Sequence, residues 1–578
     1  MGREPRATLY RRSAALRPLR RSCWATVYIV DISSPHRIPD ELYFLPGRSG
    51  FSCHPGRCAK IDVMDPKRIQ EDRGSEFRWL IGTILVISAV IGVVYQPVFH
   101  FELLGDAYQL VYHAHRASSH PTLLFAEVDG LLRPSATWTL VADRFLWGAS
   151  PTGYHTSNLL LFAVAAMLAA VVGRRLGLGR MASSLVAILW VSSPFTDEIA
   201  ILVAGRIQIL LAISWLVLII AWPRQEESWN RVNITAVVCA TAAAMTSKET
   251  WVVTPGLVFL LEVGQHRLRP TRALRTALSF LIAVGLYLVV YLALGLGASG
   301  YFKWSLAPLA KIPHEMAAFM QFEELLPLAF TLTWRGVFAL AVIVGLAVVC
   351  WRRRLWSGLP AFGLLFLPTL PTLLVPYLPQ RFTAIPFLGF LLVIAIVLSN
   401  QRDVIPQLRL YRAGVAAVVL LVFLAGVRTV RADLVDYKLI SEAHGRLLRE
   451  TEILVPHLPH GVPIVSVRLE REQPLLEILR APTGLVKLPY TRNNDPYGLI
   501  DTVALFDWVA ADRGLCVQEI RNISSAGTGI EPVVIGHRQG GFDFLPANAQ
   551  SVSENVHHWS ESGHPVRTFR IVPCGTNR

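Results

Sequence analysis

The chain has 578 residues, of which 53% are hydrophobic and 17% are charged, and its formal net charge is +14. A soluble protein of this length would divide into several domains with more charge on their surfaces, so these values exclude an ordinary soluble protein. The arginines stand in short clusters between apolar blocks. That pattern is typical of cytoplasmic loops in a membrane protein, and it disfavours nucleic acid as the partner of the positive charge.

The N-terminal segment, residues 1–77, is polar, basic and rich in turn-forming residues. Its first 21 residues hold seven arginines and one glutamate, and no apolar stretch follows within the reach of a secretory signal. We expect a basic, disordered segment here. Met64 opens a charged run that leads directly into the first apolar block, so the true start of the chain is left open between Met1 and Met64.

Eleven apolar blocks follow within residues 78–430, and we interpret each as a candidate membrane span, although several fall short of the roughly 20 residues that cross a hydrocarbon core. The sequence therefore predicts an all-α polytopic membrane bundle of about eleven transmembrane helices. The blocks around Ser183 and Trp251 are the weakest candidates. In chain order the blocks are Trp79–Tyr95, Asn158–Val172, Ser183–Val191, Ile207–Trp222, Val232–Met245, Trp251–Leu261, Ala277–Leu296, Gly336–Cys350, Leu359–Val375, Phe382–Leu398 and Ala413–Val427.

Basic clusters between these blocks indicate the orientation. If every block crosses once, the clusters at 174–180, 267–275, 352–354 and 402–412 share one side, which the positive-inside rule makes the cytoplasm. The N-terminus is then inside and the C-terminus outside. Arg428 and Arg431 fall on the outer side and oppose this assignment.

One semi-apolar stretch, Thr137–Gly148, lies in the long loop that follows the first block. Asp143 and Arg144 stand in its middle, where charges would be costly if the stretch crossed the membrane. We therefore predict a helix lying on the membrane surface.

Hydropathy falls after Arg431, and residues 431–578 have the pattern of a small soluble domain. A helical pattern runs over Asp433–Leu454, and a strand-like stretch follows at Ile464–Leu469. We predict a mixed α/β domain on the extracytoplasmic side. Its cysteines, Cys516 and Cys574, are predicted to form a disulfide, because an oxidising compartment permits one.

Ionisable residues gather at the predicted outer ends of the spans. They are Asp106, Asp197, Glu198, Arg206, Lys248, Glu249 and Arg381. A carboxylate at the outer face can take the proton of an acceptor hydroxyl, while arginine and lysine hold a lipid phosphate. The alternatives are ordinary loop charges, structural ion pairs and, for Asp106, a cap on the helix that follows it.

The order of these residues resembles the GT-C superfamily, the multispan glycosyltransferases that take sugars from polyprenyl-phosphate carriers, and in particular the protein O-mannosyltransferases. The resemblance covers about Trp79 to Ser399 and consists of short motifs. In chain order these are Gly105-Asp106, Arg133-Pro134, Trp147-Gly148, Pro151, Gly153-Tyr154-His155, Asn158, Pro194, Glu198, Gly205-Arg206, Ser247-Lys248-Glu249 and Arg381-Phe382.

The resemblance implies roles for the site residues. Asp106 would be the catalytic base, with Glu198 ordering the site. Residues assigned to substrate binding are Arg133, His155, Asn158, Arg206, Lys248, Glu249 and Arg381, of which Arg206, Lys248 and Arg381 would serve the lipid phosphate. Many relatives carry two adjacent acidic residues in the first loop, whereas Ala107 follows Asp106 here. No metal ligand is therefore assigned, and a divalent metal ion is left open as a cofactor.

Together these features predict a membrane glycosyltransferase, of hexosyl or mannosyl transferase type, that uses a polyprenyl-phosphate sugar at the outer face and inverts the anomeric configuration. The acceptor, whether protein, lipid or glycan, is not indicated. The Ala- and Arg-rich composition favours a bacterial inner membrane. A transporter or lipid flippase is the main alternative, and a non-catalytic membrane scaffold is the third.

Overall fold

The computed structural model describes residues 66–125, 132–224, 228–265, 270–293, 332–372, 380–400, 408–460, 462–468, 502–511, 513, 515–519, 533–538, 541–545 and 566–573. The chain divides into two units, Met1–Ile69 and Gln70–Arg578, and the helical bundle and the strands belong to the second. The predicted disorder of residues 1–65, the start at Met64 and the pairing of Cys574 lie outside the described residues. Helix α1 (Pro66–Val94) begins inside the segment 1–77, so the predicted disorder is wrong for residues 66–77.

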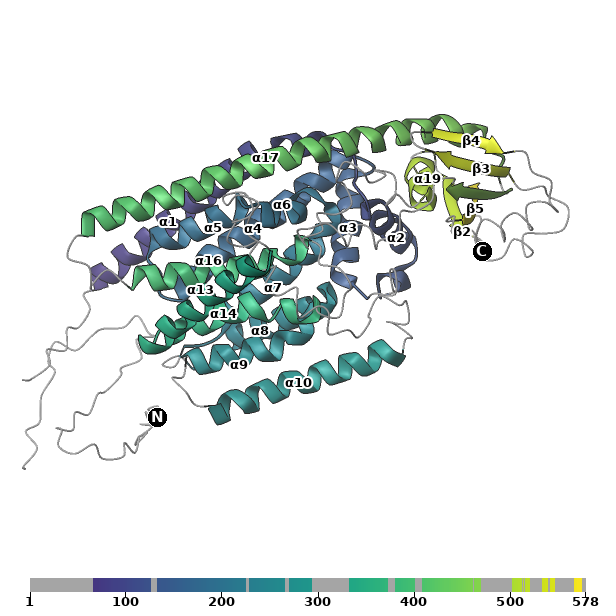
Figure 1. Ribbon diagram of the computed structural model, residues 1–578. Helices are drawn as coiled ribbons and strands as arrows, with labels where there is room; N and C mark the ends of the chain where they lie inside the picture. Colours follow the sequence, from purple (N-terminus) through teal and green to yellow (C-terminus); the bar gives the residue numbers. More distant parts are fainter. Residues whose placement is uncertain are drawn as a thin grey trace, which may run out of the picture. The chain divides into compact units, whose positions relative to one another are not determined.

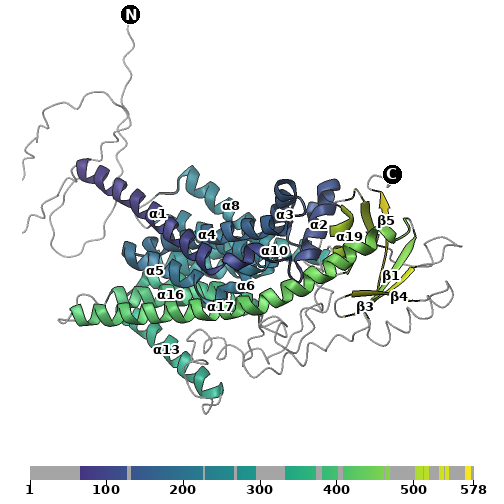
Figure 2. The same ribbon diagram turned by 90° about the horizontal axis from the view of Figure 1, so that it is seen from above.

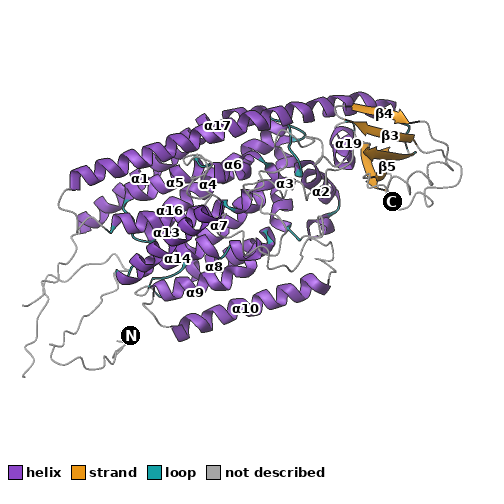
Figure 3. Cartoon of the chain, in the orientation of Figure 1, coloured by secondary structure: helices purple, strands orange, loops and turns teal. Residues whose placement is uncertain are grey.

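Helices dominate the described part of the chain (Figure 3). Five are long and apolar enough to cross a membrane, and they lie in α1, α4 (Pro151–Arg175), α7 (Arg206–Ala221), α10 (Pro270–Ala293) and α17 (Leu408–Leu454). The chain is thus a helical membrane protein, while the number of eleven spans stays a prediction. The remaining predicted blocks coincide with helices outside these five, which are α5 (Arg180–Val191), α8 (Arg231–Ser247), α9 (Thr254–Gln265), α13 (Leu332–Arg352), α14 (Leu359–Phe366), α15 (Thr369–Thr372) and α16 (Ala384–Ser399).

A sharp break separates α5 from α6 (Pro194–Ile201), and the two helices pass the test for a span only if taken together, which gives a sixth candidate. They are bent by 65° at the break. Pro194 stands at the first turn of α6, where its missing N–H costs nothing, and Ser193 caps the helix by accepting a hydrogen bond from the Phe195 backbone. The bend sets the direction of the short helix that carries Glu198.

The core of the bundle contains large aromatic side chains and glycines at close helix contacts. The Trp190 indole donates a hydrogen bond to the carbonyl oxygen of Ala384 over 2.7 Å and thereby joins α5 to α16. At Gly389 an added Cβ would lie 2.3 Å from the Leu365 nitrogen, so only glycine lets α16 and α14 approach this closely.

The segments between α1 and α4 form a layer of short helices, α2 (Ala107–Ser119) and α3 (Pro134–Trp147). Helix α3 covers most of the semi-apolar stretch of the sequence. Phe145 and Leu146 on this helix are 77% and 70% exposed, whereas Asp143 is buried. The helix therefore exposes large apolar side chains near its C-terminal end while it buries the charge of Asp143, and its position at the membrane surface remains a prediction.

Helix α17 runs past α5 and α6 and continues to the C-terminal strands (Figures 1 and 2). Those strands form one sheet in the order β2-β5-β1-β3-β4. Strand β1 (Pro463–Arg468) pairs in parallel with β3 (Val533–Arg538), while β2 (Leu515–Glu519), β4 (Gly541–Leu545) and β5 (Val566–Pro573) pair antiparallel with their neighbours. Helix α19 (Thr502–Ala511) packs on β2 and β5.

Candidate active site

Asp106 stands at the end of a buried loop, directly before α2. Gly105 adopts a φ of +57°, a conformation that glycine tolerates better than other residues, and it turns the chain into the helix. Asp106 occupies the cap position of α2, but its side chain makes no capping hydrogen bond. The alternative that Asp106 serves as a helix cap is therefore wrong. Its carboxylate, 44% exposed, instead lies 3.8 Å from the Arg381 guanidinium.

Arg381 joins two acidic residues. It lies in the short 3-10 helix η7 (Gln380–Phe382), and its side chain is 16% exposed. Its backbone N–H donates to Glu198 Oε2 over 2.8 Å, and its Nη1 lies 3.5 Å from Glu198 Oε1. Glu198 is fully buried. The guanidinium thus connects a buried carboxylate on α6 to the more exposed carboxylate of Asp106.

Lys248 brings a second cation to this cluster. Helix α8 ends at Ser247, and Lys248 continues in extended conformation into the 3-10 helix η4 (Glu249–Val253). The Lys248 ammonium lies 3.5 Å from the centre of the Phe382 ring, next in sequence to Arg381. The residue is 6% exposed, and its amine makes no hydrogen bond or ion pair to the described part of the chain. Burial lowers the pKa of Lys248 well below its ordinary value, and the nearby Arg133 adds to this effect.

The neighbouring Glu249 forms an ion pair with Arg133. The guanidinium binds both carboxylate oxygens, with Nε 2.9 Å from Oε1 and Nη2 3.1 Å from Oε2. Burial by itself would raise the pKa of Glu249, but Arg133 and Lys248 outweigh it, so that the pKa lies below its usual value. This bidentate pair ties the start of α3 to η4, beside Lys248.

Arg206 lies in a separate pair that sequence reasoning missed. Its guanidinium is 1% exposed and its Nη1 lies 2.5 Å from Asp143 Oδ2, on the buried side of α3. Nη2 donates a hydrogen bond to the Tyr154 carbonyl oxygen. This arrangement disfavours the expected contact of Arg206 with a lipid phosphate. A signal for the pairing was present, since an aspartate within a semi-apolar helix requires a buried partner.

His155 and Asn158, both fully buried on α4, bind backbone atoms. The His155 imidazole donates from Nε2 to the carbonyl oxygen of Glu102, over 3.2 Å. The Asn158 amide lies within 3.2 Å of the carbonyl oxygens of Ile199, Ala200 and Leu202, at the end of α6. These two side chains hold the segments that carry Asp106 and Glu198.

The donor set does not suit a divalent metal ion. Both carboxylates of the cluster already face the Arg381 guanidinium. Within the residues that the structure describes, no three His, Cys, Asp or Glu side chains gather as metal ligands. We therefore derive no step that passes through a metal.

No protein-family model matches this chain. No curated protein matches it either. Among solved structures, the chain is similar to the crystal structure of ArnT from Cupriavidus metallidurans bound to undecaprenyl phosphate, with a TM-score of 0.46 and 12% sequence identity over 85% of this chain and 98% of that chain. The similarity is distant, and it assigns neither a residue nor an activity to this chain.

Proposed function

We propose that the protein is a membrane glycosyltransferase that moves a sugar from a polyprenyl-phosphate donor to an acceptor hydroxyl, with inversion at the anomeric carbon. The observation that carries the proposal is the cluster of Asp106, Glu198, Lys248 and Arg381. These residues come from four separate parts of the chain and combine one accessible carboxylate with two cations.

Lys248 supports a phosphate as the ligand. A buried ammonium is unfavourable, and although Glu249 and Glu198 favour the charged form of Lys248, the nearby Arg133 and Arg381 oppose it. An anion beside the ammonium would lower that cost. Phosphate oxygens accept strong charge-assisted hydrogen bonds from lysine and arginine. Arg381 stands beside Lys248 through the adjacent Phe382, so one phosphate group can be reached by both cations.

Asp106 supports the transfer chemistry. It is the more exposed of the two carboxylates, so an acceptor hydroxyl can approach it. In the proposed step the acceptor oxygen forms a bond to the anomeric carbon while the bond from that carbon to the phosphate oxygen breaks. The hydroxyl proton passes to Asp106, and the polyprenyl phosphate leaves with its charge met by Lys248 and Arg381. Glu198 holds Arg381 in place.

The other predicted site residues support this cluster from outside. We assign Arg133 with Glu249, and Arg206 with Asp143, to ion pairs that fix α3 against η4 and α7. His155 and Asn158 anchor the backbone near the two acids. None of these residues needs to touch the sugar in this proposal.

The orientation and the substrates of the proposed enzyme rest on the sequence. The basic clusters support a cytoplasmic N-terminus and extracytoplasmic residues 431–578, which places the reaction at the outer face. A hexosyl or mannosyl donor, a protein, lipid or glycan acceptor and a bacterial inner membrane complete the proposal.

The experiment uses the purified full chain in lipid nanodiscs with a panel of radiolabelled polyprenyl-phosphate sugars. The proposal predicts release of polyprenyl phosphate and transfer of label to an acceptor alcohol, and NMR of the product gives the anomeric configuration. In the matched variant Lys248→Met, we expect donor turnover to be lost. A folded protein that leaves every donor of the panel intact would overturn the proposal.

One observation favours the alternative of a transporter or flippase. The candidate span formed by α5 and α6 is broken by 65° and carries the buried Glu198, and broken spans with buried charges are typical of transporters. Proteoliposomes separate the two functions, because a flippase would move a labelled lipid between leaflets without breaking its glycosidic bond.

A further inference from the structure

Helix α17 contacts the segments on either side of the proposed site. An added Cβ at Gly426 would lie 2.6 Å from the Ser192 carbonyl oxygen, so α17 presses closely on the break before α6. Further along the same helix, Ser441 and His444 reach the loop before Asp106. One continuous helix therefore touches the segment that leads to Glu198 and the segment that leads to Asp106.

Two side chains of α17 bind successive residues of the Asp106 loop. Ser441 Oγ accepts a hydrogen bond from the Glu102 backbone N–H over 2.8 Å. The His444 imidazole, fully buried, donates from Nδ1 to the Leu103 carbonyl oxygen over 2.9 Å. Since His155 binds the Glu102 carbonyl oxygen, side chains of α4 and α17 together hold this short loop. Unpaired backbone groups at such buried positions would be costly, so these bonds define the path of the loop.

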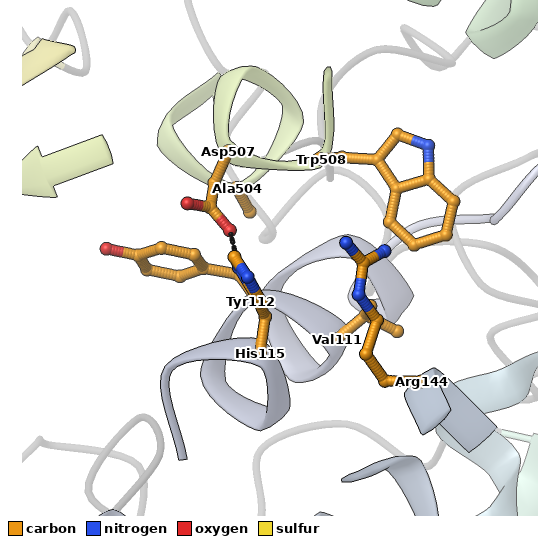
Figure 4. Close-up of a pocket in the computed structure, with 7 residues that line it drawn as sticks. All are labelled: Val111, Tyr112, His115, Arg144, Ala504, Asp507 and Trp508. Carbon is orange, nitrogen blue, oxygen red and sulfur yellow. Dashed lines mark hydrogen bonds and ion pairs between the residues drawn. The ribbon is translucent and has the colours of Figure 1, made fainter. Parts of the chain in front are cut away.

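Helix α19 holds α2, the helix that begins directly after Asp106. The Trp508 ring contacts the rings of Tyr108 on α2 and Tyr154 on α4, with centroids 6.1 Å and 5.8 Å apart. His115 on α2 binds Asp507, with Nδ1 2.8 Å from Oδ2 (Figure 4). The α2 helix, the end of α17 and α19 share one hydrophobic core.

We infer that the C-terminal part of α17, from residue 431 to Leu454, and helix α19 together hold Asp106 in position. We call these two elements the brace, and Ser441 and His444 are its positioning residues. This gives residues 431–578 a role in the reaction itself, that of holding the base against Arg381. The brace itself depends only on the contacts of these helices. Its link to catalysis rests on the proposed function of Asp106.

The first readout is hydrogen–deuterium exchange of peptides covering 101–112 in the purified full chain. His444→Ala should speed exchange there about fivefold or more, which is the factor expected when a single buried hydrogen bond is lost. His444→Asn should restore protection, because the asparagine amide can donate from nearly the same position as Nδ1. Lys438→Ala, at a residue on the same helix that is 65% exposed, should leave exchange unchanged.

The second readout is transfer from the donor that the wild-type chain uses. His444→Ala should lower kcat by about tenfold or more, since a misplaced base loses part of its typical contribution. The KM for the donor should change little, because Lys248 and Arg381 are untouched. If His444→Ala does not fold, Ser441→Ala, which removes the neighbouring bond, is measured in the same two ways.

The two readouts distinguish a failure of the brace from a failure of the proposed function. Unchanged exchange at 101–112 in both folded variants overturns the brace, whatever the transfer assay gives. Faster exchange with unchanged kcat and a raised KM overturns the positioning of Asp106. A wild-type chain without any transfer overturns the proposed function, while the exchange experiment still decides whether the brace exists.

Discussion

The pair of Asp143 and Arg206 offers a sharp energetic test, and the perturbation is Asp143→Asn. Asparagine keeps the volume and removes the charge. The side chains are 6% and 1% exposed and the charged atoms lie 2.5 Å apart, so Arg206 would be left as a buried cation facing a neutral amide and the Tyr154 carbonyl oxygen instead of a carboxylate. Arginine cannot shed its proton to avoid this cost. Breaking a buried ion pair from one side costs about 3–5 kcal/mol, and we expect a loss of this size in the free energy of unfolding.

Chemical unfolding in detergent, followed by tryptophan fluorescence, measures that loss. Asp436→Asn, at an exposed aspartate, is the matched control and should change stability by less than about 0.5 kcal/mol. The double variant Asp143→Leu with Arg206→Met removes both charges and should recover part of the loss. A change below about 1 kcal/mol in Asp143→Asn, with no coupling to Arg206, would refute the assignment of this pair.

Two further predictions concern the cluster and its support. Because burial lowers the pKa of Lys248, its charged form declines as pH rises through that lowered value, so affinity for a phosphodiester donor should fall on the alkaline side. Lys248→Arg should bind with less pH dependence, since guanidinium stays charged, and a flat wild-type titration of donor binding would contradict this. An added Cβ at Gly205 would lie 2.5 Å from the Ile199 backbone, so Gly205→Ala should cost about 1–3 kcal/mol of stability and lower transfer by displacing α6. Unfolding and transfer measurements on that variant check both effects, and wild-type values in both would count against the packing argument.

The sequence predicts which ionisable residues gather in the cluster, but it does not predict which of them pair with one another. Asp106, Glu198, Lys248 and Arg381 each stand beside an apolar block, and such positions meet at one end of a helical bundle. Which charges pair with each other depends on side-chain packing between segments far apart in the chain. The sequence alone indicates that Asp143 would be costly inside a membrane, yet nothing in its local sequence identifies Arg206 as its partner.

The same limit applies to the spans and to the C-terminal region. The break at Pro194 explains why the block at Ser183 is short, because the helix changes direction there instead of continuing. The contacts of Ser441 and His444 with the loop at Glu102 could not be predicted, since a serine and a histidine in a helical pattern carry no sign of a distant backbone partner. Periodicity predicts helices and strands, while tertiary hydrogen bonds need the assembled fold.

The variant Asp106→Asn examines whether Asp106 is the base of the proposed sugar transfer. Asparagine retains the size and hydrogen-bonding shape of the side chain but cannot accept the proton. We measure kcat for transfer and, separately, binding of the labelled donor. If Asp106 is the base, kcat should fall by about 100-fold or more while donor affinity stays near the wild-type value. Wild-type transfer by Asp106→Asn would contradict it.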